Sequence, residues 1–122
     1  MALDITQGPQ GGQHSPSVNW VSMHFSTWGH IGDAFRCMLE EESITITPEI
    51  AQFRDTLGIK CNGKVSSIVL AKNALLVSQL ATKPKMFCDP EADYDPGIQE
   101  TTTKLSELMT DAASHGRCMS FG

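Results

Sequence analysis

The chain has 122 residues, a length that fits one domain with one modest hydrophobic core. Hydrophobic residues make up 40% of the chain and charged residues 19%, which excludes a protein that is disordered throughout. The formal net charge of −5 argues against a dedicated nucleic-acid-binding protein, and no apolar run is long enough to cross a membrane.

The first ten residues, MALDITQGPQ, lack the basic region and the apolar stretch of a secretion signal. We therefore expect an intracellular protein whose four cysteines, Cys37, Cys61, Cys88 and Cys118, are reduced thiols. An even number of cysteines would also allow two disulfides, in any of three pairings.

Residues 1–17 are rich in Gln, Gly, Pro and Ser. Such a segment has too few apolar side chains to bury a face, so we expect a flexible N-terminal arm. The remaining residues, 18–122, are expected to form a single helical domain.

The first helical pattern runs from about Val18 to Glu42, with Ser17 placed to cap it. Apolar residues recur along it every three or four positions and form one stripe. Gly29 and Gly32 weaken the middle of this helix by about 1 kcal/mol each relative to Ala. Two explanations stay open: the glycines split the segment into two helices, or a small residue lets a neighbouring backbone come close.

A second helix is predicted where Thr47 can cap the helix and Pro48 can take its first position. Ile50, Phe53 and Leu57 supply its apolar face, and Gly58 is a natural stop. Just before it, the stretch SITIT alternates apolar and polar residues like a strand but is very short.

The pair Asn62-Gly63 favours a tight turn, which either closes one very short β-hairpin or joins two helices. From Val65 to Ala81 nearly every residue is apolar or small. A helix that is apolar nearly all round belongs in the centre of a bundle or in a subunit interface. The competing interpretation is a buried strand over residues 65–70, but the length and the Leu and Ala content favour a helix.

The last helix is predicted to run from Pro96 to His115, capped by Asp95 and stopped by Gly116. Leucine, methionine and alanine residues at helical spacing give it a stripe to bury. Together the segments predict a mainly α-helical protein, a compact bundle of four or five helices with a flexible N-terminal arm and at most one very short β-hairpin.

Acidic residues alternate in the stretch DPEADYDPGIQE. Five of them match positions 1, 3, 5, 7 and 12 of an EF-hand calcium loop: Asp89, Glu91, Asp93, Asp95 and Glu100. The match fails at Tyr94, where the sharp turn needs Gly, and at Pro96, which has no N–H. An acidic linker that ends in a helix cap is the better interpretation.

The basic residues gather in the middle of the chain, where residues 54–85 hold six bases and one acid between two acidic segments. The simplest interpretation is that the three segments pack with complementary surface charges. The alternative is an anion-binding face of a nucleic-acid-associated accessory protein, formed by Arg54, Lys60, Lys64, Lys72, Lys83 and Lys85.

The sequence has no P-loop, no dinucleotide-binding glycine motif and no local catalytic triad, and we expect no cofactor. A small enzyme would have to assemble its site from distant residues, for which His24, His30, Cys37 and His115 are the obvious groups.

The sequence favours a non-enzymatic module for protein–protein interaction and assembly, which binds a second copy of itself or another protein and no membrane. The expected interface residues are Trp20, Val65, Val69, Leu76 and Leu80.

Overall fold

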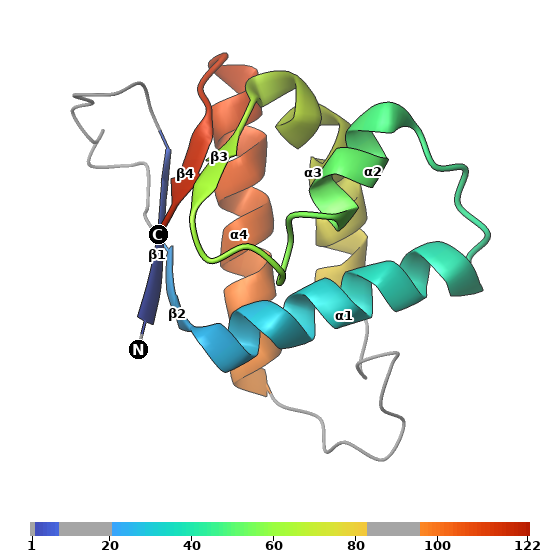
Figure 1. The fold of residues 1–122 in the computed structure, drawn as a ribbon, viewed down its shortest axis with the longest axis horizontal. Helices are drawn as coiled ribbons and strands as arrows, with labels where there is room; N and C mark the ends of the chain where they lie inside the picture. Colours follow the sequence, from blue (N-terminus) through green and yellow to red (C-terminus); the bar gives the residue numbers. More distant parts are fainter. Residues whose placement is uncertain (1, 8–20, 83–95) are drawn as a thin grey trace.

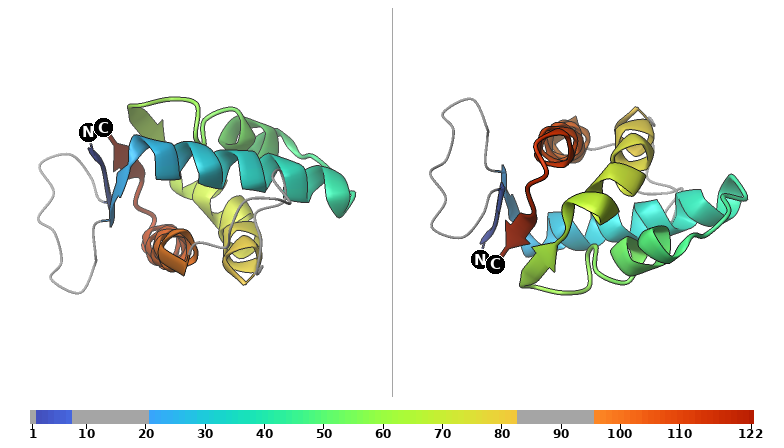
Figure 2. Two further views of the ribbon diagram at one scale, coloured as in Figure 1. Left: turned by 90° about the horizontal axis from the view of Figure 1, so that it is seen from below. Right: turned by 90° about the horizontal axis from the view of Figure 1, so that it is seen from above.

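The computed structural model describes residues 2–7, 21–82 and 96–122. Over these residues the fold is mixed: four antiparallel strands form one sheet in the order β2-β1-β4-β3, and four helices lie to one side of it (Figures 1 and 2). The prediction of a mainly α-helical bundle is therefore wrong, because segments near both ends of the chain are strands.

The centre of the sheet is β1 (Ala2–Gln7), which pairs with β2 (Val21–His24) on one side and β4 (Met119–Phe121) on the other. The short edge strand β3 (Gly63–Val65) pairs with β4. Asp4 and Gly122 exchange two backbone hydrogen bonds of 3.1 and 3.2 Å, so segments far apart in sequence lie side by side (Figure 1).

Alternation of side chains explains why residues 2–7 join the sheet instead of forming the predicted flexible arm. Leu3 and Ile5 are buried, whereas Asp4 between them is exposed. A strand points successive side chains to opposite faces, so this short segment buries its two large apolar residues against the helices.

The first helix, α1 (Phe25–Glu41), is shorter at its start than the predicted helix of residues 18–42. Val21 and Met23 are buried on one face of β2, while Ser22 and His24 are exposed. This period-two pattern places residues 21–24 in the sheet and overrides the three-and-four spacing that continues into α1.

Helix α2 (Pro48–Arg54) begins where the sequence predicts. The backbone N–H of Ile50 donates to Oγ1 of Thr47 at 3.2 Å, which is the expected cap. Ile44 and Ile46 before it are in no strand, although their alternation suggested one.

Helix α3 (Ser67–Ala81) packs mainly against α4 (Pro96–Ser114), which ends close to the predicted stop at Gly116. Ser66 caps α3, accepting a hydrogen bond from the backbone N–H of Val69 at 3.4 Å. The Asn62-Gly63 pair closes no local hairpin, since Gly63 starts β3 and its partner strand is β4.

Gly32 in α1 lets another backbone approach closely, which decides between the two explanations left open by the sequence. A Cβ at this position would lie 2.3 Å from the carbonyl oxygen of Leu57 and 2.8 Å from Cα of Gly58. Gly58 itself has φ of +77°, and a Cβ there would lie 2.8 Å from the carbonyl oxygen of Trp28. α1 is thus one continuous helix that crosses the chain after α2 backbone to backbone.

One of the described cysteines differs from the expected reduced thiols. Cys37 in α1 is disulfide-bonded, whereas Cys61 and Cys118 form no disulfide. Disulfides persist in oxidising environments, so the bond at Cys37 argues against that expectation. Cys88 lies outside the described residues.

No helix in the described ranges has both the length and the apolar character needed to cross a membrane.

Candidate functional site

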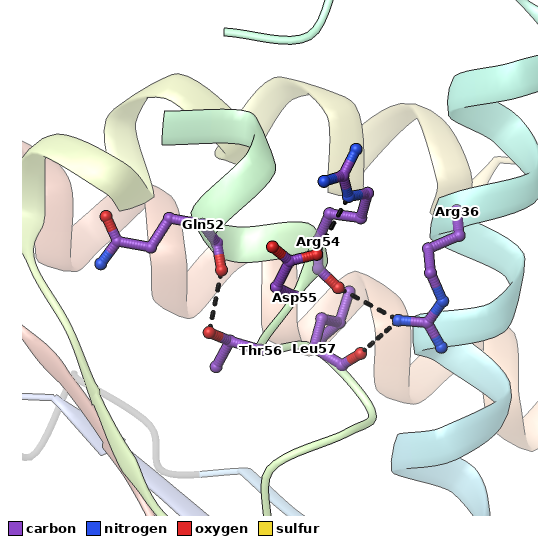
Figure 3. A network of polar contacts seen from close by, with 6 residues as sticks. All are labelled: Arg36, Gln52, Arg54, Asp55, Thr56 and Leu57. Carbon is purple, nitrogen blue, oxygen red and sulfur yellow. Dashed lines mark hydrogen bonds and ion pairs between the residues drawn. The ribbon is translucent and has the colours of Figure 1, made fainter. Parts of the chain in front are cut away.

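Arg36 on α1 ties the end of α2 to α1 (Figure 3). Its Nη1 donates to the carbonyl oxygens of Arg54 at 3.1 Å and Leu57 at 2.8 Å, and its Nη2 donates to Oδ1 of Asp33 at 2.7 Å. Carbonyls at the end of a helix lack donors within the helix, so the Arg36 guanidinium supplies them. Arg36 therefore has a structural task.

Arg54 on α2 is used differently. Its Nε donates to Oδ1 of the neighbouring Asp55 at 3.1 Å, while its two terminal nitrogens contact no other described residue. Figure 3 shows these terminal nitrogens pointing away from Asp55. Its side chain is 36% exposed, so the guanidinium is held at Nε by Asp55 while its terminal nitrogens remain open to a ligand.

A cavity of about 480 Å³ opens between the C-terminal half of α1, the chain that follows it and α2. Its apolar walls are Leu39, Ile44 and Ile46. Arg36, Glu40 and Arg54 line it with charged groups. A volume of this size lies within the usual range of small-molecule pockets, about 300–1,000 Å³.

The second surface of interest is the outer face of α3. Ile68 is 67% exposed and Leu75 is 68% exposed, the two highest values among the large hydrophobic residues described as exposed. Ala71 and Lys72 lie between them on the same exposed face. The opposite half of α3 is buried against α2 and α4, so the helix has one packed and one open face.

Four of the five predicted interface residues lie within the described ranges, and none of these four is exposed. Val65, Val69 and Leu80 are buried in the core of the chain, and Leu76 is partly buried against it. Trp20 lies outside the described residues. The apolar residues that α3 exposes are Ile68 and Leu75 instead.

The predicted anion-binding residues are spread over several elements. Arg54 ends α2, Lys60 follows it, Lys64 is in β3 and Lys72 is on the outer face of α3. Lys83 and Lys85 lie outside the described residues. Of this set, Arg54 is the member that lines the cavity.

Four of the five predicted calcium ligands, Asp89, Glu91, Asp93 and Asp95, fall outside the described residues. The fifth, Glu100, is exposed on α4, where its Oε1 lies 3.5 Å from Nζ of Lys104. Within residues 2–7, 21–82 and 96–122, no three His, Cys, Asp or Glu side chains come close enough to hold a metal ion.

The residues proposed for a distant catalytic site are spread over three parts of the fold: His24 ends β2, His30 and Cys37 lie on α1, and His115 follows α4. His115 does neighbour a serine and an aspartate. Its Nδ1 lies 3.3 Å from Oγ of Ser114 and 3.5 Å from Oδ1 of Asp111. A catalytic triad needs the two partners on different ring nitrogens, so this cluster is not one.

No family model matches the sequence, and comparisons with curated proteins and with solved structures found no match. Function is therefore inferred from the geometry of the described residues.

Apart from Arg54, the sequence reasoning missed the charged and exposed residues that characterise these two sites. Ile68 and Leu75 carry a signal, because a spacing of seven puts them on one helical face. Glu40, Ile44 and Ile46 carry none, since the cavity forms only when the turn after α1 folds against α2.

Proposed function

We propose that the protein is a protein–protein association module that pairs with a second copy of itself through the outer face of α3. The observation that carries this proposal is the exposure of Ile68 and Leu75, at 67% and 68%. Burying such side chains in a partner would stabilise a complex by roughly 25 cal/mol per Å² of apolar surface.

The position of these residues on the helix supports the proposal. At about 100° per residue, a spacing of seven places Ile68 and Leu75 about 20° apart around α3. They occupy the middle of its exposed half, flanked by Lys72 on one side and Ser78 on the other. Apolar side chains at the border of a buried face can fold back onto the core, whereas these two cannot.

An antiparallel pair of α3 helices suits this arrangement. With a twofold axis close to Ala71, Ile68 of one copy would meet Leu75 of the other, and each contact would occur twice. The small side chain of Ala71 would let the helices approach, and the aliphatic stem of Lys72 would cover the seam while its ammonium stays in water. The opposed helix dipoles would add a favourable term.

The charges on α3 indicate what should hold the pair together. The helix has one cation, Lys72, and no acidic residue, so the pairing has no ion pair along its seam. Association should therefore persist or strengthen in high salt, because the apolar contact is not screened. Joining of acidic and basic patches would instead weaken steeply with salt.

Sedimentation equilibrium of the wild type and of Leu75→Glu tests the proposal. The wild type should form a dimer, and Leu75→Glu should be a monomer, because the carboxylate would be buried without a partner. Ser78→Glu is the matched control, since it adds the same charge beside the seam and should leave most of the dimer intact. A wild type that stays monomeric at high concentration would overturn the proposal.

A further inference from the structure

The cavity between α1 and α2 has chemistry that the proposed association does not use. It is lined by the apolar side chains of Leu39, Ile44 and Ile46, and by the charged groups of Glu40 and Arg54. Ile46 is 41% exposed, although it is a large aliphatic residue. An aliphatic group in the cavity would therefore remove apolar surface from water.

Two of the three charged side chains that line the cavity have polar atoms open to a ligand. Arg54 presents its terminal nitrogens, because its contact to Asp55 uses Nε alone. The carboxylate of Glu40 makes no hydrogen bond or ion pair with any described residue, and it does not pair with Arg54. A guanidinium with open terminal nitrogens and a carboxylate without a described partner thus line one cavity without pairing with each other.

Arg36 also lines the cavity, but its guanidinium is already hydrogen-bonded within the protein. Its guanidinium already donates to two carbonyl oxygens and to Asp33. It holds the end of α2, and therefore Arg54, in place. In this cavity Arg36 is therefore held by its own hydrogen bonds, and Arg54 is the arginine whose terminal nitrogens can bind a ligand.

We propose that this cavity binds a small aliphatic zwitterion, of the kind represented by an aliphatic dipeptide. The ligand carboxylate would accept two hydrogen bonds from the terminal nitrogens of Arg54, the geometry that a guanidinium favours. Its ammonium would pair with Glu40. Its aliphatic side chains would lie on Leu39, Ile44 and Ile46. A ligand with only a negative charge would be repelled by Glu40, and a ligand with only a positive charge would be repelled by Arg54.

Calorimetric titration of the full chain with three matched probes tests the proposal. L-leucyl-L-leucine carries both charges, its N-acetyl form lacks the ammonium, and its C-terminal amide lacks the carboxylate. The unblocked dipeptide should bind at least about tenfold more tightly than either blocked form, as the loss of a charge-assisted hydrogen bond implies. Equal affinities for all three, or no saturable binding of the unblocked dipeptide, would overturn it.

Two variants assign the charges to their residues. In Glu40→Gln the unblocked dipeptide and its N-acetyl form should bind alike, and in Arg54→Gln the unblocked dipeptide and its amide should bind alike. Glu41→Gln is the control, because this exposed neighbour does not line the cavity and should keep the full preference. Circular dichroism checks that each variant is folded. A folded variant that keeps the full wild-type preference for the unblocked dipeptide would contradict the assignment. None of these outcomes depends on whether α3 mediates association.

Discussion

The crossing of Gly32 with Gly58 and the outer face of α3 are opposite cases of how this chain uses a surface. At the crossing, two backbone segments approach so closely that neither position has room for a Cβ. On α3, Ile68 and Leu75 project from the helix with most of their surface in water. The first region has no room for one more carbon atom, and the second leaves about two-thirds of two large apolar side chains exposed.

This contrast in packing distinguishes residues that specify the fold from apolar residues that folding leaves exposed. The crossing fixes where α2 lies relative to α1, and Trp28 supports it by donating from Nε1 to the carbonyl oxygen of Lys60 at 2.9 Å. The α3 face contributes little to folding, so its apolar character needs another explanation. Association supplies one.

The largest effect should come from Gly32→Ala. The added methyl group would meet the backbone of Leu57 and Gly58, which cannot move aside as a flexible side chain could. We expect a loss of at least about 4 kcal/mol in the free energy of unfolding, measured by urea denaturation.

Gly29→Ala, one helical turn away on α1, is the matched control for this substitution. Apart from its chain neighbours and the nearby backbone of α1, nothing lies within 4 Å of its added Cβ, so the better helix propensity of Ala should stabilise the protein by about 1 kcal/mol. If the two alanine variants lose stability equally, the crossing is not as tight as the structure has it.

The second-largest difference in the free energy of unfolding should be between leucine-to-alanine changes on the buried and the exposed face of α3. Leu70 is fully buried, so Leu70→Ala should lower the free energy of unfolding by about 3 kcal/mol. Leu75→Ala should change it by no more than about 0.5 kcal/mol at dilutions where the protein is monomeric. The same variant should shift a dimer towards monomer in sedimentation experiments. Similar losses at both sites would mean that Leu75 belongs to the core.

Substitutions of Arg36 and Arg54 should differ by an intermediate amount in the free energy of unfolding. Arg36→Met removes charged donors from two carbonyl oxygens and should reduce the free energy of unfolding by about 2 kcal/mol. Arg54→Met removes a contact to an exposed carboxylate and should change it by less than about 0.5 kcal/mol. Thermal or urea unfolding of both variants measures the difference, and a reversed order would contradict the structural task given to Arg36.

The smallest effect should come from the exposed pair of Glu100 and Lys104 on α4. Both side chains are mostly in water and their charged atoms lie 3.5 Å apart. Glu100→Gln should therefore change the free energy of unfolding by less than about 0.5 kcal/mol in denaturant titrations. A larger loss would contradict this prediction, because it would mean that the Glu100 carboxylate stabilises α4 by more than an exposed ion pair does.

Local signals in the sequence located the helices well. Thr47 and Pro48 marked the start of α2, and Gly116 marked the end of α4, because a cap or a left-handed glycine acts within a few residues. The nearly uniform apolar character of residues 65–81 also predicted a helix, although it did not show which face the chain itself would cover.

The sheet was not predicted because its strands are short and its pairings are distant. Leu3 and Ile5 alternate with polar residues, but two apolar positions in a polar segment do not distinguish a strand from an arm. Phe121, which pairs with Ile5 in the sheet, stands near the other end of the sequence. The cavity was missed for the same reason, since Glu40 and Arg54 line one cavity only because of the turn between α1 and α2.

The pairing of β1 with β4 also sets an order of events during synthesis. β1 leaves the ribosome early, but the strand that covers one of its edges is made only after all four helices. Until then, one row of backbone donors and acceptors on β1 stays open to any other extended chain. The α3–α4 pair can form before the sheet closes, so the nascent protein should reach its native state by adding a finished strand to a helical layer that already exists.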